Sequence, residues 1–197
     1  MKTGIFGGSF NPVHKGHIHL AESVRDSLEL DRVIFVPSKI SPHKSSSEYV
    51  SEEHRLNMLR LAVENKKNFE VSDYELNCER VSYSIYTIKH FREIYPDDEL
   101  YLLIGSDMLL CFDKWYCFKE IMAEVTLTVT SRQDGDFGEL YKKADELSAF
   151  GRIIINKTEP FPLSSTEIRK KIMKNHNYTC YLDKNVVQYI TLNNLYG

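Results

Sequence analysis

The first seventeen residues constrain the fold most strongly, because they combine a short apolar segment, a glycine-rich turn and the start of a helix. The segment from Lys2 to Phe6 has the length of a buried strand, and Gly7 and Gly8 then let the backbone turn tightly and approach a ligand closely. Pro12 stops the strand. Apolar residues then recur at three- and four-residue steps: Ile18, Leu20, Ala21, Val24 and Leu28. That spacing is the helical period, so the pattern predicts a strand, a turn and a helix.

The rest of the chain alternates apolar runs of strand length with stretches of helical period. We expect strands at 32–36, 69–74, 100–104, 125–130 and 152–155 and helices at 51–63, 84–95, 136–149 and 184–195, with two short helices within 108–122 and another that opens at 164–167. Such alternation implies a parallel sheet covered on both faces. We therefore predict a single doubly wound, Rossmann-like α/β domain over residues 1–197, with about six parallel strands.

In a doubly wound fold, ligands bind at the carboxyl ends of the strands. Four unusual stretches each follow a predicted strand: Gly7–His17, Pro37–Lys44, Gly105–Asp107 and Ser164–Arg169. We expect these stretches to converge on one crevice.

Composition excludes several classes of protein. The formal net charge of -3 disfavours a general nucleic-acid binder, since that role needs a basic surface. The longest apolar stretches are far shorter than a membrane span, so we expect no membrane anchor. The four cysteines have no paired spacing and Met1 opens no apolar signal segment, which favours reduced thiols in the cytoplasm. The sequence leaves open whether the chain forms a homo-oligomer.

His14 and His17 lie one helical turn apart at the predicted helix N-terminus. The exposed N–H groups and the positive dipole end of a helix bind anions, and two imidazoles there can donate to one phosphate. A metal site is disfavoured, because no cysteine or carboxylate stands at a supporting spacing. A purely structural pair remains an alternative. The turn matches neither G-x-G-x-x-G nor the Walker A loop, which disfavours dinucleotide-dependent oxidoreductases and P-loop enzymes.

Ser164, Ser165 and Thr166 precede Arg169 by less than two turns. Alone, these residues could be a helix cap and a surface arginine. Beside the first motif, they offer a second helix N-terminus, three hydroxyls and a guanidinium that suit a polyphosphate.

The loop after the second strand carries Lys39, His43 and Lys44 among serines. Solvated charge on a flexible segment is one interpretation. The other is a cationic loop that closes over a triphosphate.

Trp115 and Tyr116 stand at the irregular junction within 108–122. Trp115 could belong to the core, or the pair could form a platform for a flat heterocycle.

Together these motifs resemble the nucleotidyltransferase superfamily that carries H-x-G-H. Gly7–His17 is similar to its signature, and Leu163–Arg169 is similar to its partner motif near the C-terminus. Within the superfamily, Pro37–Lys44, Ile104–Met108 and the Trp115-Tyr116 pair resemble motifs of bacterial nicotinate-nucleotide adenylyltransferases.

The resemblance implies transfer of AMP from ATP to nicotinate mononucleotide, with Mg²⁺ carried on ATP. It implies four catalytic residues: His14, His17, Lys44 and Arg169. It implies an ATP site made of Gly7, Gly8, Ser9, Phe10, Gly16, Gly105, Asp107, Ser164, Ser165 and Thr166. It implies a mononucleotide site made of Lys39, Tyr83, Ser84, Trp115 and Tyr116, and no metal site on the protein itself.

The chain departs from the family pattern in the mononucleotide region. Ser84 replaces the threonine of an S-Y-T segment, Val81 replaces a proline before it, and residues 132–135 replace an R-P-G turn. A sister enzyme that prefers nicotinamide mononucleotide, and a non-enzymatic nucleotide-binding protein, are therefore the alternatives.

Overall fold

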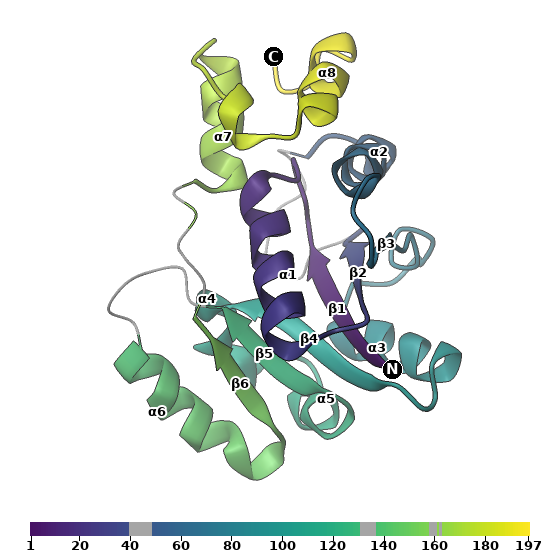
Figure 1. Cartoon of the computed structure of the whole chain (residues 1–197), viewed down its shortest axis with the longest axis vertical. Coiled ribbons are helices and arrows are strands. Elements are labelled where there is room, and N and C mark those ends of the chain that lie inside the picture. The colour runs from purple at the N-terminus through teal and green to yellow at the C-terminus, as the bar shows by residue number, and fades with distance from the viewer. Residues whose placement is uncertain (40–48, 131–136, 158–160, 162) are drawn as a thin grey trace.

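A computed structural model describes residues 1–39, 49–130, 137–157, 161 and 163–197, and within them six parallel strands form one sheet (Figure 1). The strands are β1 (Lys2–Gly8), β2 (Arg32–Pro37), β3 (Phe69–Val71), β4 (Glu99–Gly105), β5 (Thr126–Thr130) and β6 (Ile153–Asn156). Their order is β3-β2-β1-β4-β5-β6. The chain switches direction across the sheet between β1 and β4, which is where a doubly wound fold opens a crevice. The predicted fold class is confirmed.

Helices connect the strands and follow the last one. They are α1 (Lys15–Leu28), α2 (Glu52–Val63), α3 (Ser84–Ile94), α4 (Ser106–Leu109), α5 (Phe118–Glu124), α6 (Phe137–Leu147), α7 (Ser165–Met173) and α8 (Lys184–Leu192). Short 3-10 helices occur at Phe112–Lys114, Ser148–Phe150 and Thr179–Tyr181.

The sheet separates two hydrophobic cores, because side chains on each strand alternate between its faces. On one face, Phe6, Phe35 and Leu103 pack with apolar residues of α1, α2, α7 and α8. On the other face, Ile5 and Ile34 pack with α3, α4, α5 and α6. This three-layer arrangement leaves the strand ends as the edges at which polar sites form.

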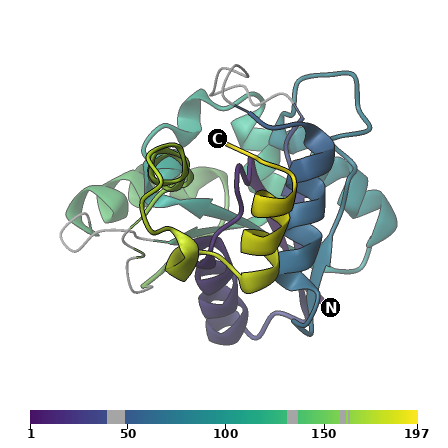
Figure 2. The same ribbon diagram turned by 90° about the horizontal axis from the view of Figure 1, so that it is seen from above.

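The two C-terminal helices lie together beyond the carboxyl end of β1 (Figure 1). Seen from above, α8 lies beside α2 (Figure 2), where Asn57 donates to the Tyr189 hydroxyl at 3.1 Å. The end of the chain thereby returns to the helix that follows its second strand.

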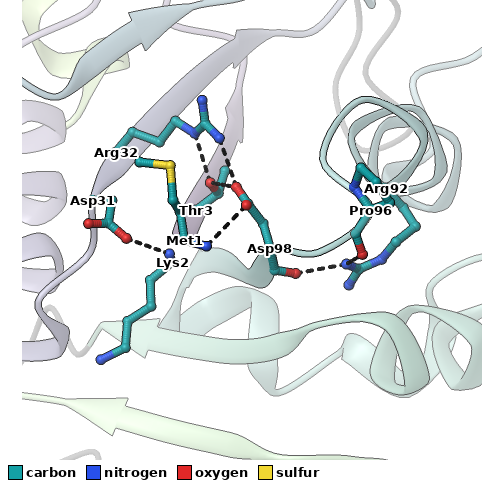
Figure 3. Close-up of polar contacts among 8 residues, drawn as sticks. All are labelled: Met1, Lys2, Thr3, Asp31, Arg32, Arg92, Pro96 and Asp98. Carbon is teal, nitrogen blue, oxygen red and sulfur yellow. Dashed lines mark hydrogen bonds and ion pairs between the residues drawn. The ribbon is translucent and has the colours of Figure 1, made fainter.

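At the amino end of the sheet, a polar cluster surrounds the Asp98 carboxylate (Figure 3). It accepts hydrogen bonds from the Met1 amine at 3.1 Å, the Thr3 hydroxyl at 2.7 Å and the Arg32 guanidinium at 2.8 Å. Arg92 donates to the Asp98 carbonyl at 2.7 Å. The cluster joins the starts of β1, β2 and β4 into one ion-paired unit.

Several predicted boundaries differ from the structure by a few residues. The third strand ends at Val71 rather than Tyr74, because the chain turns from residue 74 onward. The first of the two short helices begins earlier than expected, since α4 starts at Ser106 directly after β4, and a 3-10 turn occupies the hinge around Asp113. The final helix ends at Leu192 rather than Leu195.

Candidate active site

The first predicted site element lies at the carboxyl end of β1. Gly8 is paired with Pro37 of β2, and its carbonyl accepts a hydrogen bond from the Ser38 N–H at 2.9 Å. A Cβ atom on Gly7 would have no described neighbour within 4 Å, so the end of the strand faces open space. The absence of a side chain at Gly7 leaves its backbone accessible.

The turn after β1 is anchored by the ring of Phe10. This ring is buried and packs against Phe6, Phe35 and His17, with centroid separations between 5.1 and 5.8 Å. A Cβ on Gly8 would lie 3.0 Å from the Phe10 ring, so glycine permits this close packing. Phe10 therefore anchors the turn by placing its side chain in the core.

The two motif histidines stack on each other at the N-terminus of α1. Their ring centroids are 3.7 Å apart, and His17 Nδ1 accepts a hydrogen bond from the His14 backbone N–H at 3.2 Å. In a neutral ring, this leaves the proton on His17 Nε2, which becomes a donor. The arrangement fits a donor to a phosphate oxygen.

Gly16 fits the same packing arrangement. Phe161 stacks on His14 with an interplanar angle of 8°, and a Cβ on Gly16 would lie 2.5 Å from the Phe161 ring and 2.9 Å from His14 Nδ1. A larger residue there would displace one of the two rings. The glycine of H-x-G-H is thus required by the position of His14.

The N-terminus of α7 docks on the turn after β1. The Ser165 hydroxyl donates to the Pro12 carbonyl at 2.9 Å, and Arg169 donates to the Asn11 carbonyl at 2.9 Å. Ser164 caps the helix through a reciprocal capping box with Glu167. Two segments separated by about 150 residues therefore form one site, and the N-termini of α1 and α7 meet at it.

Further donors hold the turn from behind. Arg55 of α2 is 1% exposed and donates to the Ser9 carbonyl at 2.8 Å. The Asn11 side chain is equally buried, and its Oδ1 accepts from the Tyr196 hydroxyl at 2.7 Å and from the Val50 N–H at 3.4 Å. Burial lowers the pKa of Arg55, although nearby Glu52 opposes the shift. The carbonyl side of the turn is thereby bound to the protein.

A second group of predicted residues is aromatic. The ring centroid of Tyr83, at the start of α3, lies 4.7 Å from that of Tyr116, and the ring centroid of Tyr86 lies 6.2 Å from the same point. Trp115 packs on Phe112 at 5.0 Å and is half-buried. The exposed Tyr116 ring and the rings beside it offer flat surfaces to a heterocycle.

The segment before α3 is fixed by a buried carboxyl group. Glu75 accepts a hydrogen bond from the Thr87 hydroxyl at 2.6 Å and interacts with the Ser82 hydroxyl, which itself accepts from the Lys39 N–H at 3.1 Å. Burial raises the pKa of Glu75, while both hydroxyls act to lower it. Glu75 thus links Lys39 to the Tyr83 segment.

Comparison with known proteins identifies the family. The Cytidylyltransferase-like family model matches residues 5–171. A Carboxydothermus hydrogenoformans protein named probable nicotinate-nucleotide adenylyltransferase is 38% identical, with 99% of this chain and 98% of the relative covered. A Borreliella burgdorferi protein of the same name is 37% identical, with 100% and 97% covered. The chain belongs to the nicotinate-nucleotide adenylyltransferase family.

A solved structure of the Plasmodium falciparum nicotinic acid mononucleotide adenylyltransferase in complex with NaAD has the same fold. It superposes with a TM-score of 0.79 at 21% sequence identity, covering 100% of this chain and 98% of that one. The resemblance drawn from the sequence motifs is therefore confirmed at the level of family and fold.

For this nicotinate-nucleotide adenylyltransferase family member, the structure brings together most of the residues predicted for ATP. Gly7 to Phe10, Gly16 and the two histidines meet Ser164 to Arg169, while Gly105 ends the neighbouring strand β4 and Asp107 lies in the first turn of α4. Lys44 and His43 lie outside the described residues. The roles assigned to all these residues stay predictions.

Sequence reasoning missed Arg55, Asn11, Glu75, Tyr86 and Tyr196. A signal existed for Arg55, because it shares the helical face of the buried Met58 and Leu59. Tyr86 follows Tyr83 by three residues, one turn of helix, which also points to a shared surface.

Two features are absent from the described part of the chain. Its His, Cys, Asp and Glu side chains form no group of three or more that could hold a metal ion. Its helices include none that is both long enough and apolar enough to span a membrane.

Proposed function

We propose that the protein transfers the AMP group of ATP to nicotinate mononucleotide, yielding deamido-NAD and pyrophosphate. The observation that carries the proposal is the docking of α7 on the turn after β1, through Ser165 to Pro12 and Arg169 to Asn11. It joins two helix N-termini, two histidines and a guanidinium, the groups that a polyphosphate requires. The names of the relatives and the NaAD held by the Plasmodium enzyme support the same reaction.

The chemistry needs no general base. The attacking group is the phosphate monoester of the mononucleotide, whose second pKa of about 6 leaves it mostly ionised at pH 7. One of its oxygens forms a bond to the α-phosphorus of ATP, and the bond from that phosphorus to the bridging oxygen of pyrophosphate breaks. Catalysis then consists of aligning two anions and neutralising the charge on the leaving group.

The described residues suit these tasks. His17, with its proton on Nε2, is positioned to donate to the transferring phosphate, and His14 stacks against it. Arg169 and the N–H groups that begin α1 and α7 supply positive charge for the triphosphate. Lys44 is proposed to bind the same phosphates.

The mononucleotide is proposed to bind between the aromatic cluster and the end of β2. Trp115, Tyr116 and Tyr83 supply flat surfaces for the pyridine ring. Ser84 begins α3, where backbone N–H groups can bind a carboxylate. Lys39 adds a positive charge at the end of β2.

Family members generally use a divalent metal, and we propose Mg²⁺. A hard cation of this kind binds phosphate oxygens and would enter with ATP, neutralising part of its charge. We also propose that the protein acts in the cytoplasm, which agrees with its four free cysteines.

The test is pyrophosphate release by purified protein with ATP, Mg²⁺ and nicotinate mononucleotide. We expect release by the wild type and by His19→Ala, which alters an exposed histidine on the same helix, and strong loss in His17→Ala. Equal release by His17→Ala and wild type would contradict the proposed site. Faster turnover of nicotinamide mononucleotide than of the acid would change the substrate, and an absence of any release would favour a nucleotide-binding protein.

A further inference from the structure

Tyr196, which follows α8, returns to the turn after β1. Its hydroxyl donates to Asn11 Oδ1 at 2.7 Å across 185 residues of sequence. Its backbone has a φ of 66°, in the left-handed region that an aromatic residue seldom adopts. Such a conformation persists only where surrounding contacts demand it. With its backbone in this conformation, Tyr196 makes the hydrogen bond from its hydroxyl to Asn11 Oδ1.

Asn11 is the point at which three parts of the chain meet. Its side chain accepts from Tyr196 and from the Val50 N–H that precedes α2, and its carbonyl accepts from Arg169 of α7. Asn11 is 1% exposed, so water cannot substitute for these donors. Loss of one donor would leave a buried oxygen of the turn without that hydrogen bond.

The neighbouring carbonyls are bound in the same way. Ser9 O accepts from Arg55 and Pro12 O accepts from Ser165. Protein donors therefore bind three carbonyls of the turn, those of Ser9, Asn11 and Pro12. These hydrogen bonds fix the peptide planes of the turn. We have proposed that the triphosphate binds on the opposite side of the same peptides.

The phenol is suited to this position. It lies near both Arg169 and Arg55, and burial raises its pKa although the two guanidinium groups act to lower it. The hydroxyl consequently keeps its proton at neutral pH and remains a donor to Asn11.

We propose that Tyr196 is a positioning residue for ATP: through Asn11, it fixes the turn from Ser9 to Pro12 in the conformation that binds the triphosphate. The inference rests on the proposed function for its account of turnover. It acts on the ATP side of the site and leaves the aromatic mononucleotide side unchanged.

Tyr196→Phe tests the proposal, because it removes one oxygen and keeps the ring. Tyr189→Phe is the matched control. The Tyr189 hydroxyl also joins distant elements, lying 2.9 Å from His54 Nδ1 and accepting from Asn57, but its described partners are on α2 rather than on the turn. The readouts are the KM for each substrate, the Kd for ATP with Mg²⁺, and the Tm.

We expect Tyr196→Phe to raise the KM and Kd for ATP by about three- to tenfold, the range that one hydrogen bond supports. Its KM for nicotinate mononucleotide should stay within about twofold of wild type, as should both KM values of Tyr189→Phe. An unchanged Kd for ATP in Tyr196→Phe, or an equal rise in Tyr189→Phe, would overturn the proposal. The Kd for ATP decides this without turnover, so failure of the proposed reaction is read separately, from the wild type.

Discussion

The two ends of the central sheet use charge in opposite ways. At the amino end, the Asp98 carboxylate receives the Met1 amine and the Arg32 guanidinium, so cations and anion compensate each other within the chain (Figure 3). At the carboxyl end, Arg55 and Arg169 donate to the carbonyls of Ser9 and Asn11, which are neutral. Neutral acceptors orient a guanidinium without cancelling its charge. The amino end therefore stabilises the fold, and the carboxyl end is where we propose that the polyanion binds.

The largest expected effect is on the carboxyl end. Arg169→Ala should lower kcat/KM for pyrophosphate release on the order of 100-fold, the cost of removing a donor aimed at developing charge. Lys170→Ala changes the exposed neighbour on the same helix and should retain activity near that of wild type. If both variants lose activity equally, the assignment of positive charge to Arg169 fails.

Asp98→Asn should show the opposite behaviour, with full activity and reduced stability. The change leaves the half-buried Arg32 guanidinium and the exposed Met1 amine without their carboxylate, and losing two hydrogen bonds to a charged group costs about 3 kcal/mol. For a chain of this size, thermal denaturation should give a Tm lower by roughly 6–12 °C. A loss of kcat/KM comparable with that of Arg169→Ala, at temperatures where the variant is folded, would show that the amino end also contributes to activity and would contradict the comparison.

The pH dependence of stability tests whether the charge of the Asp98 carboxylate stabilises the amino end of the sheet. Burial alone would raise the pKa of Asp98, but hydrogen bonds from Thr3, Arg32 and the Met1 amine lower it to about 2. A carboxyl pKa below its unfolded value of about 3.9 contributes stability above that value, which is lost as the pH falls toward 2. The Tm difference between wild type and Asp98→Asn should therefore narrow across this window. A difference that stays constant from pH 5 to pH 2 would show that the carboxylate charge is not responsible.

Much of this arrangement was predictable from local sequence. The alternation of apolar runs and helical periods predicted the six strands, and the doubly wound rule predicted that Gly7–His17 and Ser164–Arg169 would meet. The hydrogen bonds behind the turn were not predictable. Tyr196 and Asn11 are 185 residues apart, and nothing in their local sequence selects one as the partner of the other.

Two side chains with partners closer in sequence, Glu75 and Ser164, also have roles that local sequence leaves open. Glu75 reads as a surface carboxylate in sequence, yet it is buried against Thr87 because the chain turns back from β3 onto α3. Ser164 was predicted among the ATP residues, and the structure shows the capping role that a serine before a helix also suggests. Tertiary packing determines the position of Glu75, whereas a local capping box with Glu167 determines that of Ser164, whose role toward ATP stays a prediction.

The smallest expected effect concerns Glu75, whose behaviour should be the reverse of that of Asp98. Burial raises the pKa of Glu75, so its contribution to stability is present below the unfolded value of about 4.3 and is lost as the pH rises above it. Glu75→Gln should thus gain stability relative to wild type between pH 4 and pH 7, by roughly 2–4 °C in Tm. Glu120→Gln, on an exposed carboxylate, is the control, and a gain of the same sign and size there would refute the assignment.

The central claim is that the site formed by the N-termini of α1 and α7 transfers AMP. Its most direct test is mass-spectrometric identification of the products formed from ATP, Mg²⁺ and nicotinate mononucleotide. The account predicts deamido-NAD and pyrophosphate in equal amounts from wild type, and near-complete loss of both from Arg169→Ala. Formation of ADP, or of AMP without the dinucleotide, would contradict it.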